Sequence, residues 1–586
     1  MSKRLRALLA ATGVLAGLSG LVLLNADTPR TNLGKRVGDF RLKDTRGRVV
    51  SLGDFKDKKA VAVVFIGTEC PISNAFMPRL AELHKEYESQ GVQFLAINSN
   101  CQDRPADVAR HAKEHHLRFP VLKDVGNRVA DVFGARRTPE VFLLDGRRAI
   151  CYQGRIDDQF GVGYKRPRPT RRDLAEAIHD VLAGKSVRQP TTGIAGCAIA
   201  RLPKPKQDGP VTYAKNIARI LQKNCQECHR PGQIGPMPLL TYDDAVAWAE
   251  TISEVVRDSR MPPWPADPRY GKFANDRRLT PRERRLLLRW LDEGTPRGDD
   301  QDLPPPRKFV AGWTIGKPDL VVTMPRAYDV AAEMPAAGVP YQYVHVDPGF
   351  KEDRWVVRAE AKPGAASVVH HLIVFVQPPG TTFFPGGPET PALAGMAPGD
   401  MPLVLTEGTA KKVPAGSKLV FQVHYTPNGT AEKDRSSVGL IFAKKPPRHE
   451  MLVEPIANVA IKIPPGAGNY EAKAGFAFRR DGHISGFMPH MHLRGKDFRF
   501  EAIYPDGKTA VLLSVPRFNF NWQSAYRLAK PLPMPRGTRI RCTAHFDNSA
   551  RNPNNPDATK EVRWGEQTWE EMMIGWMDYY YDSKAQ

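Results

Sequence analysis

Cysteine is scarce in this sequence, with only 7 among 586 residues. Domains that depend on a disulfide scaffold carry far more cysteine for their length, so that class of protein is excluded. Each cysteine therefore has to be interpreted from its own surroundings.

Long apolar runs are also rare. Lys3, Arg4 and Arg6 precede an uncharged apolar stretch at 7–24, Asp27 ends it, and no second run of membrane-spanning length follows. This pattern predicts an export signal and a location in the periplasm or outside the cell. No clean cleavage site follows the stretch, so a cleaved signal and a membrane anchor, each covering 1–26, are both kept as alternatives.

Acidic residues are in deficit. The chain has 85 Lys and Arg against 63 Asp and Glu, a formal net charge of +22. The basic residues are spread along the chain, and the densest stretch, at 165–172, is rich in proline and typical of a linker. Together with the export signal, this favours a solvated basic surface and no nucleic-acid partner.

Two stretches cannot support a packed core, because proline, glycine and charge cluster at 185–210 and 295–308. A chain of this length should hold three or four domains at roughly 100 to 200 residues each. We therefore expect a multidomain protein. Its expected parts are an α/β domain at 36–185, a linker at 186–210, an all-α domain at 211–298, a linker at 299–312, and two β-sandwiches at 313–450 and 451–586.

The α/β expectation for 36–185 comes from alternating patterns. The apolar strand runs AVAVVFIG, VQFLAINS and EVFLLD are interleaved with helical periodicity to about residue 89, near 106–116 and at 171–183. Cys70, in GTECPISN, falls where a strand ends and a helix begins, and a helix N-terminus stabilises a thiolate. Cys70 is therefore the expected reactive thiol, and the alternative is a degenerate domain with an inert buried cysteine.

This region resembles the thioredoxin and peroxiredoxin superfamily, through Cys70 with Pro71 after it and through Thr138-Pro139, where the family keeps a cis proline. It departs from the family at Ser73, which occupies the second position of the usual CxxC pair, so dithiol exchange by that route is unavailable. Either Cys101 or Cys197 would then have to act as the resolving partner.

A haem motif stands in the second region. The string NCQECH contains Cys225, Cys228 and His229 in the spacing that attaches haem c covalently, with the histidine as proximal iron ligand. Zinc would require a further Cys or His pair nearby. Outside the motif itself, Cys197 is the only Cys or His between 191 and 313. The stretch resembles mono-haem cytochromes c, in which a methionine followed by prolines precedes the final helix. This resemblance favours Met261, in RMPPW, over Met237 as the sixth ligand.

After residue 313 the composition changes to short β runs such as DLVVTM, HHLIVFVQ, KLVFQVHY and FRFEAIY, separated by Pro and Gly turns. These runs predict an all-β region, built as two jelly-roll-like sandwiches in tandem.

Histidines in this β region are spaced for metal binding. His490 and His492 are two residues apart and would share one face of a strand, whereas adjacent His370 and His371 would diverge and need a local twist. His424, in KLVFQVHYTP, is the best third ligand for the adjacent pair. Imidazole binds several metals, but the thioether of methionine selects soft Cu(I). A histidine-rich site with a methionine in an exported protein therefore favours copper.

The segments VVHHLIVF, FQVHYTPNG, PHMHLRG and WEEMMIGWMDYY resemble, in this order, the ascorbate-dependent copper monooxygenases that hydroxylate peptidylglycine and dopamine. The resemblance implies two copper ions. It assigns His370, His371 and His424 to an electron-transfer copper, and His490, His492 and Met572 to the copper that activates O2, which makes the second set catalytic together with Cys70. Met488 stands where peptide-acting members place an arginine, so peptide amidation is not expected.

The leading hypothesis from the sequence is a copper monooxygenase that hydroxylates a C–H bond of an unidentified small molecule. Its electrons would come from the haem domain, from ascorbate or from a periplasmic donor. The alternatives are an electron-transfer or copper-handling protein without hydroxylase activity, and a thiol peroxidase that acts through Cys70.

Overall fold

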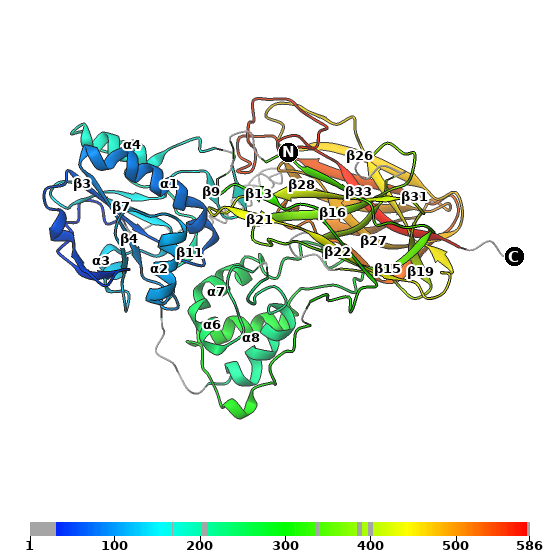
Figure 1. The fold of residues 1–586 in the computed structure, drawn as a ribbon, viewed down its shortest axis with the longest axis horizontal. Helices are drawn as coiled ribbons and strands as arrows, with labels where there is room; N and C mark the ends of the chain where they lie inside the picture. The colour runs from blue at the N-terminus through cyan, green and yellow to red at the C-terminus, as the bar shows by residue number, and fades with distance from the viewer. Residues whose placement is uncertain are drawn as a thin grey trace, which may run out of the picture.

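The computed structural model describes residues 31–166, 168–201, 209–233, 235–310, 312–333, 335, 339–383, 390–396 and 402–582. Three regions follow one another along the chain, an α/β domain, a group of helices and a large β-rich region (Figure 1). The expected signal segment at 1–26 lies outside the described residues. Within the described residues, no helix is both long and apolar enough to cross a membrane.

A single seven-stranded sheet forms the centre of the first region, in the order β2-β1-β5-β4-β3-β7-β8. In the middle, β3 runs parallel to β4 and antiparallel to β7. Every residue of β3 is buried, because helices cover both faces of the sheet. The strands are β1 (Arg41–Asp44), β2 (Val49–Ser51), β3 (Ala60–Phe65), β4 (Val92–Asn98), β5 (Val121–Lys123), β7 (Glu140–Leu144) and β8 (Ile150–Gly154).

Helices α1 (Pro71–Tyr87), α2 (Pro105–Glu114) and α4 (Asp173–Leu182) pack into one core, while α3 (Arg128–Phe133) packs into the core on the opposite face. Alternate residues of β3 divide between these two cores, as the period of two along a strand requires. The expected α/β fold is therefore confirmed, with the ends of α1, α2 and α4 within about two residues of the predicted ends.

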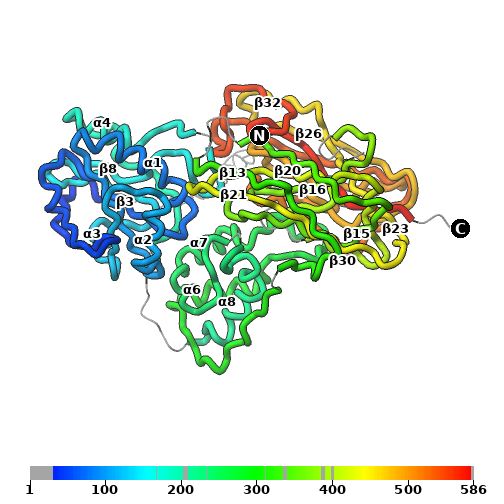
Figure 2. The backbone as a smooth tube through the Cα atoms, viewed as in Figure 1, coloured from blue at the N-terminus to red at the C-terminus, as the bar shows by residue number. Residues whose placement is uncertain are grey.

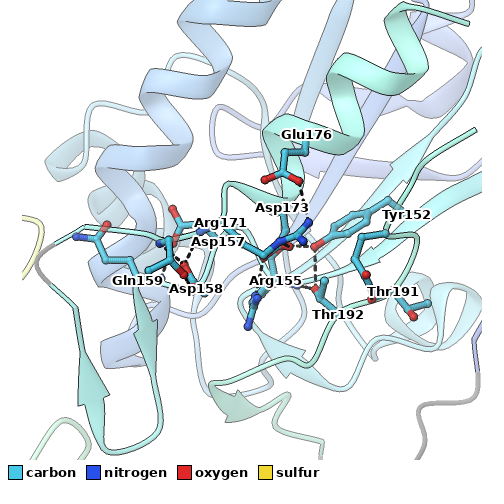
Figure 3. Close-up of polar contacts among 12 residues, drawn as sticks. Tyr152, Arg155, Asp157, Asp158, Gln159, Arg171, Asp173, Glu176, Thr191 and Thr192 are labelled. Atoms are coloured by element: carbon cyan, nitrogen blue, oxygen red, sulfur yellow. Dashed lines mark hydrogen bonds and ion pairs between the residues drawn. The ribbon is translucent and has the colours of Figure 1, made fainter. Parts of the chain in front are cut away.

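The segment after α4 returns to the sheet, although the sequence predicted a linker from residue 186. The Thr192 N–H donates to the Gln153 carbonyl of β8, whose own N–H donates to the Pro190 carbonyl. The Thr192 hydroxyl lies 2.8 Å from the Tyr152 hydroxyl. Asp173 at the start of α4 accepts a hydrogen bond from Arg155 at 2.7 Å in the same network (Figure 3). The segment then forms β11 (Cys197–Ala198), which pairs antiparallel with β6 (Arg137–Thr138). This part of the chain therefore belongs structurally to the α/β domain.

The second region is helical. It consists of a short π-helix at Tyr213–Ile217 followed by α5 (Ala218–Asn224), α6 (Tyr242–Ala247), α7 (Ala249–Arg257) and α8 (Pro281–Asp292). Trp290 of α8 is fully buried at the centre of its core. Thr280 and Glu283 form the predicted capping box at the start of α8. Glu254 of this region forms an ion pair with Arg137 of the first region, and Trp264 and Phe273 pack in a core of the third; Figure 2 shows the backbone paths of the three regions.

The third region contains only β structure within the residues described. In its first half, the sheet β12-β22-β15-β19-β23 and the sheet β14-β20-β16-β17 contribute to one core. The strands are β12 (Leu320–Thr323), β13 (Tyr328–Val330), β14 (Gln342–Val346), β15 (Arg354–Lys362), β16 (Val369–Gln377), β17 (Ala392–Met396), β18 (Leu403–Val404), β19 (Thr409–Val413), β20 (Lys418–Tyr425), β21 (Glu432–Asp434), β22 (Ser437–Phe442) and β23 (His449–Glu450).

In the second half, the sheets β24-β33-β27-β30 and β26-β31-β28-β29 share another core. Trp264 and Phe273, from the loop before α8, are part of this core, which ties the helical region to the β region. The strands are β24 (Leu452–Ala457), β25 (Lys462–Ile463), β26 (Tyr470–Ala477), β27 (Gly482–His490), β28 (Gly495–Ile503), β29 (Thr509–Val515), β30 (Tyr526–Met534), β31 (Arg539–Phe546), β32 (Val562–Arg563) and β33 (Ile574–Tyr581).

Candidate functional site

Cys70 is the N-cap residue of α1, five residues after β3 ends at Phe65. Its side chain is only 1% exposed. The Sγ atom donates to the Thr138 carbonyl at 2.8 Å and accepts from the Ser73 N–H at 3.5 Å. The thiol therefore lies in a pocket of backbone groups at the start of a helix, as the sequence predicted.

Burial alone would raise the pKa of Cys70, but hydrogen bonds from the thiol and N–H of Cys197 and from the N–H of Ser73 outweigh it. They lower the pKa of Cys70 to about 6. The amide groups at a helix N-terminus favour a thiolate for the same reason. Cys70 is consequently the most acidic thiol among the cysteines whose pKa is shifted.

The neighbourhood of Cys70 contains the other features that the sequence suggested. The Thr138–Pro139 peptide bond is cis. Ser73, in the second position of the missing CxxC pair, is fully buried, and its hydroxyl accepts the Gly67 N–H at 3.2 Å. Of the two candidate resolving cysteines, Cys197 has its backbone N–H 3.5 Å from the Cys70 sulfur. Cys101 instead has its sulfur 3.8 Å from Gln102 Oε1.

The residues of the haem motif lie together in the second region. Cys225, Cys228 and His229 follow α5 and line an apolar cavity of about 360 Å³. His229 Nδ1 lies 3.1 Å from the Met237 carbonyl, an arrangement that leaves Nε2 free to bind iron. Met261 and Met237 both line the same cavity. The residues present therefore fit a covalently attached haem.

Side chains from all three regions form the walls of this cavity. Pro71 and Ile72, directly after Cys70, line it together with Cys197, and Trp522 of the β region lines it too. A salt bridge of 2.7 Å between Arg137 of β6 and Glu254 of α7 holds the first and second regions together beside the cavity.

The first histidine group lies on two paired strands. His370 and His371 are in β16, and His424 lies opposite His371 in β20. The register shifts between Val369 and His371, and this irregularity supplies the local distortion that two adjacent ligands need. The candidate ligand atoms of the three imidazoles all lie within 4.8 Å of one another.

The surroundings of this group suit a metal. His370 Nε2 and His424 Nδ1 are buried and have no hydrogen-bond partner among the described residues. Burial lowers the pKa of both His371 and His424 well below its ordinary value, so the rings are neutral and can act as ligands. Unpartnered buried nitrogens are costly unless something binds them, and copper fits this donor set.

The second histidine group differs from the sequence prediction in one respect. Strand β27 ends at His490, so His492 lies beyond it and does not share a regular strand face. The two rings nevertheless lie close together, edge to face, with centroids 5.2 Å apart. His492 is held by Glu571, which accepts its backbone N–H at 2.8 Å. Met572 follows Glu571 and stands two residues before Ile574, which pairs with His490.

Sequence reasoning missed several residues around these histidines. Gln523 lies 2.5 Å from His490 Nδ1 and fixes that ring. Phe520 stacks on His370 with ring centroids 5.0 Å apart. It is perpendicular to the His492 ring, with centroids 6.1 Å apart. The Phe520 ring therefore contacts both histidine groups. No local pattern in the sequence connects Phe520 or Gln523 with histidines so distant along the chain.

A thioredoxin-like sheet with an acidic, buried thiol at a strand–helix junction defines the N-terminal region as a thiol redox domain. Residues 33–153 match the model of the AhpC/TSA family. The thiol-disulfide oxidoreductase ResA of Halalkalibacterium halodurans is 31% identical over 150 residues, which is 25% of this chain and 84% of that protein. ResA of Geobacillus thermodenitrificans is 33% identical over 134 residues, or 22% of this chain and 75% of that protein. Through this domain the chain belongs to the AhpC/TSA family of redox proteins.

Among solved structures, a hypothetical protein of Sinorhizobium meliloti 1021 is 35% identical in sequence, with a TM-score of 0.26. The alignment covers 28% of this chain and 93% of the chain in that structure. The family match ends at residue 153. The CxxCH motif and both histidine groups lie beyond it.

Proposed function

We propose that this chain is a thiol-dependent redox enzyme in which Cys70 reduces a hydroperoxide. The observation that supports this function is the Cys70 thiol itself, which is buried at the N-terminus of α1 and hydrogen-bonded so that its pKa falls to about 6. The thiolate is the nucleophilic form of cysteine, and it predominates at neutral pH when the pKa is this low.

Access to Cys70 favours a small oxidant. The side chain is 1% exposed and β11 lies against it, so a protein disulfide would have to displace this strand to reach the sulfur. A hydroperoxide has only to bring one of its oxygen atoms into contact with the thiolate. The named relatives are thiol-disulfide oxidoreductases, and Ser73 replaces the second cysteine of their usual motif in this chain.

The test is turnover by the full chain with an external dithiol as reductant. We expect consumption of hydrogen peroxide that persists after treatment with a metal chelator and disappears in Cys70→Ser. Cys151→Ser is the matched control, because burial raises the pKa of Cys151 and keeps it protonated. Reduction of an insulin disulfide but not of peroxide would identify the substrate as a disulfide instead.

A second function is favoured by the histidine groups. We propose that His370, His371 and His424 hold one copper ion and that His490, His492 and Met572 hold another, with O2 and a small-molecule C–H bond as substrates. The supporting observation is the convergence of three imidazoles with candidate ligand atoms within 4.8 Å. Bound copper would supply one-electron redox chemistry and oxygen activation. The protein's part is to orient the rings, through Gln523 at His490 Nδ1 and the Glu570 carbonyl at His492 Nδ1, while Glu571 holds the His492 backbone.

Haem c is the proposed third redox group; Cys225 and Cys228 would attach it, and His229 and Met261 would bind its iron. The contact between His229 Nδ1 and the Met237 carbonyl places the Met237 backbone on the side of the ring away from Nε2, which favours Met261 over Met237. Electrons would reach the copper ions from this haem, from ascorbate or from a periplasmic donor. The proposal includes export from the cytoplasm, because haem c is attached to proteins outside the cytoplasm.

Metal and haem analysis of the purified full chain tests this second function. Two copper ions and one covalent haem per chain would support it, and zinc or no metal would contradict it. Oxygen uptake that depends on an organic substrate would separate a monooxygenase from a copper-handling or electron-transfer protein.

A further inference from the structure

Cys197 lies next to Cys70, although 127 residues separate them in the sequence. In β11, Cys197 is the register partner of Thr138, the residue whose carbonyl accepts the hydrogen bond of the Cys70 thiol. The backbone N–H of Cys197 is 3.5 Å from the Cys70 sulfur, and its thiol also hydrogen-bonds to that sulfur. The Cys70 thiol and the backbone of Cys197 therefore both lie against Thr138 of β6.

The close approach of β11 depends on Gly196. A Cβ atom at this position would lie 2.1 Å from the Thr138 carbonyl oxygen, so no other residue fits without moving the strand. The Gly196 carbonyl also accepts a hydrogen bond of 2.7 Å from Arg137, the neighbour of Thr138. These contacts at Gly196 hold Cys197 beside Cys70.

The two thiols have opposite acid–base properties. Hydrogen bonds lower the pKa of Cys70, while the hydrogen bond to Cys70, burial and repulsion from the Cys70 charge raise the pKa of Cys197 well above its ordinary value. One cysteine is thus prepared as a nucleophile, and the other retains its proton until the first has reacted.

We propose that Cys70 and Cys197 form a reversible disulfide, with Cys197 as the resolving cysteine in place of the absent CxxC partner. This inference rests on the proposed function of Cys70. It adds a residue that lies beyond the matched family range of 33–153.

The chemistry balances with a hydroperoxide as oxidant and an external dithiol as reductant. The Cys70 thiolate attacks one peroxide oxygen, the O–O bond breaks, and the alkoxide leaves as an alcohol with a proton from water. Cys197 then loses its proton and attacks the sulfur of the Cys70 sulfenic acid, forming S–S while hydroxide leaves as water with that proton. The sulfur pair loses two electrons and the peroxide gains them, and the dithiol later restores both thiols.

Peptide mapping of the full chain tests the assignment. The reduced protein is treated with one equivalent of hydrogen peroxide, alkylated, digested and analysed by mass spectrometry. We expect a peptide linked through Cys70 and Cys197 in the wild type and in the control Cys101→Ser. In Cys197→Ser the linked peptide should be lost, and dimedone should capture at least 10-fold more Cys70 sulfenic acid.

Gly196→Ala provides a second variant that keeps both thiols. It should displace β11 from Thr138 and reduce the yield of the disulfide, with far-UV circular dichroism as the check on folding. A Cys70–Cys101 link, or equal dimedone capture in the wild type and Cys197→Ser, would overturn the assignment while leaving Cys70 as the reactive thiol. A Cys70 that peroxide does not oxidise would overturn the proposed peroxidase function as well.

Discussion

Replacing Cys197 with alanine should raise the pKa of Cys70. The substitution removes the thiol that donates to the Cys70 sulfur but keeps the backbone N–H at 3.5 Å. A hydrogen bond to a charged group contributes about 1.5–3 kcal/mol, and one pKa unit corresponds to about 1.36 kcal/mol. The pKa of Cys70 should therefore rise by about one to two units.

The sign of the pH dependence follows from the lowered pKa. The thiolate predominates above about pH 6 and is lost as the pH falls through that value. At pH 6, about half of the wild-type Cys70 should be ionised, and in Cys197→Ala this fraction should fall to roughly 1–10%. Cys197→Ser retains an O–H donor and should lie between the two.

The assay is the ultraviolet absorbance of the thiolate as a function of pH. It does not require a reagent to reach the buried sulfur, and subtracting the curve of Cys70→Ser isolates the contribution of Cys70. Cys101→Ser should match the wild type. A midpoint in Cys197→Ala that equals or falls below the wild-type value would refute the role given to the Cys197 thiol.

Three further predictions concern the other centres and the core. His424→Ala should lower the copper content by about one ion per chain in elemental analysis, whereas exposed His345→Ala should leave it unchanged. The double change Cys225→Ala and Cys228→Ala should abolish haem that survives denaturation, as detected by haem staining of a denaturing gel. Leu80→Ala, at a fully buried position of α1, should destabilise the α/β domain by about 2–5 kcal/mol in denaturant unfolding.

The α/β fold could be predicted because its signals are local. The uniformly apolar run of β3 and the helical periodicity of α1 each lie within fewer than twenty residues, and Cys70 stands between them in the sequence as it does in space. The start of α8 could be predicted equally well, because Thr280 and Glu283 form the capping box of this helix within a single turn.

Contacts between distant segments could not be predicted. The stretch that contains Cys197 is rich in proline and glycine and has the composition of a linker, yet β11 pairs with β6 through backbone groups that any sequence provides. Phe520 contacts both histidine groups for a similar reason, since its position depends on how the two halves of the β region pack. His492 lies just past β27, where the carboxylate of Glu571 positions it and strand periodicity does not.

Counting free thiols after oxidation is the most direct test of Cys70 as the redox centre. The reduced, chelator-treated full chain receives one equivalent of hydrogen peroxide at neutral pH, and its remaining thiols are titrated. We predict that the wild type loses two thiols per chain and that Cys70→Ser loses none. Equal losses in the two proteins would show that oxidation occurs elsewhere and would contradict the account.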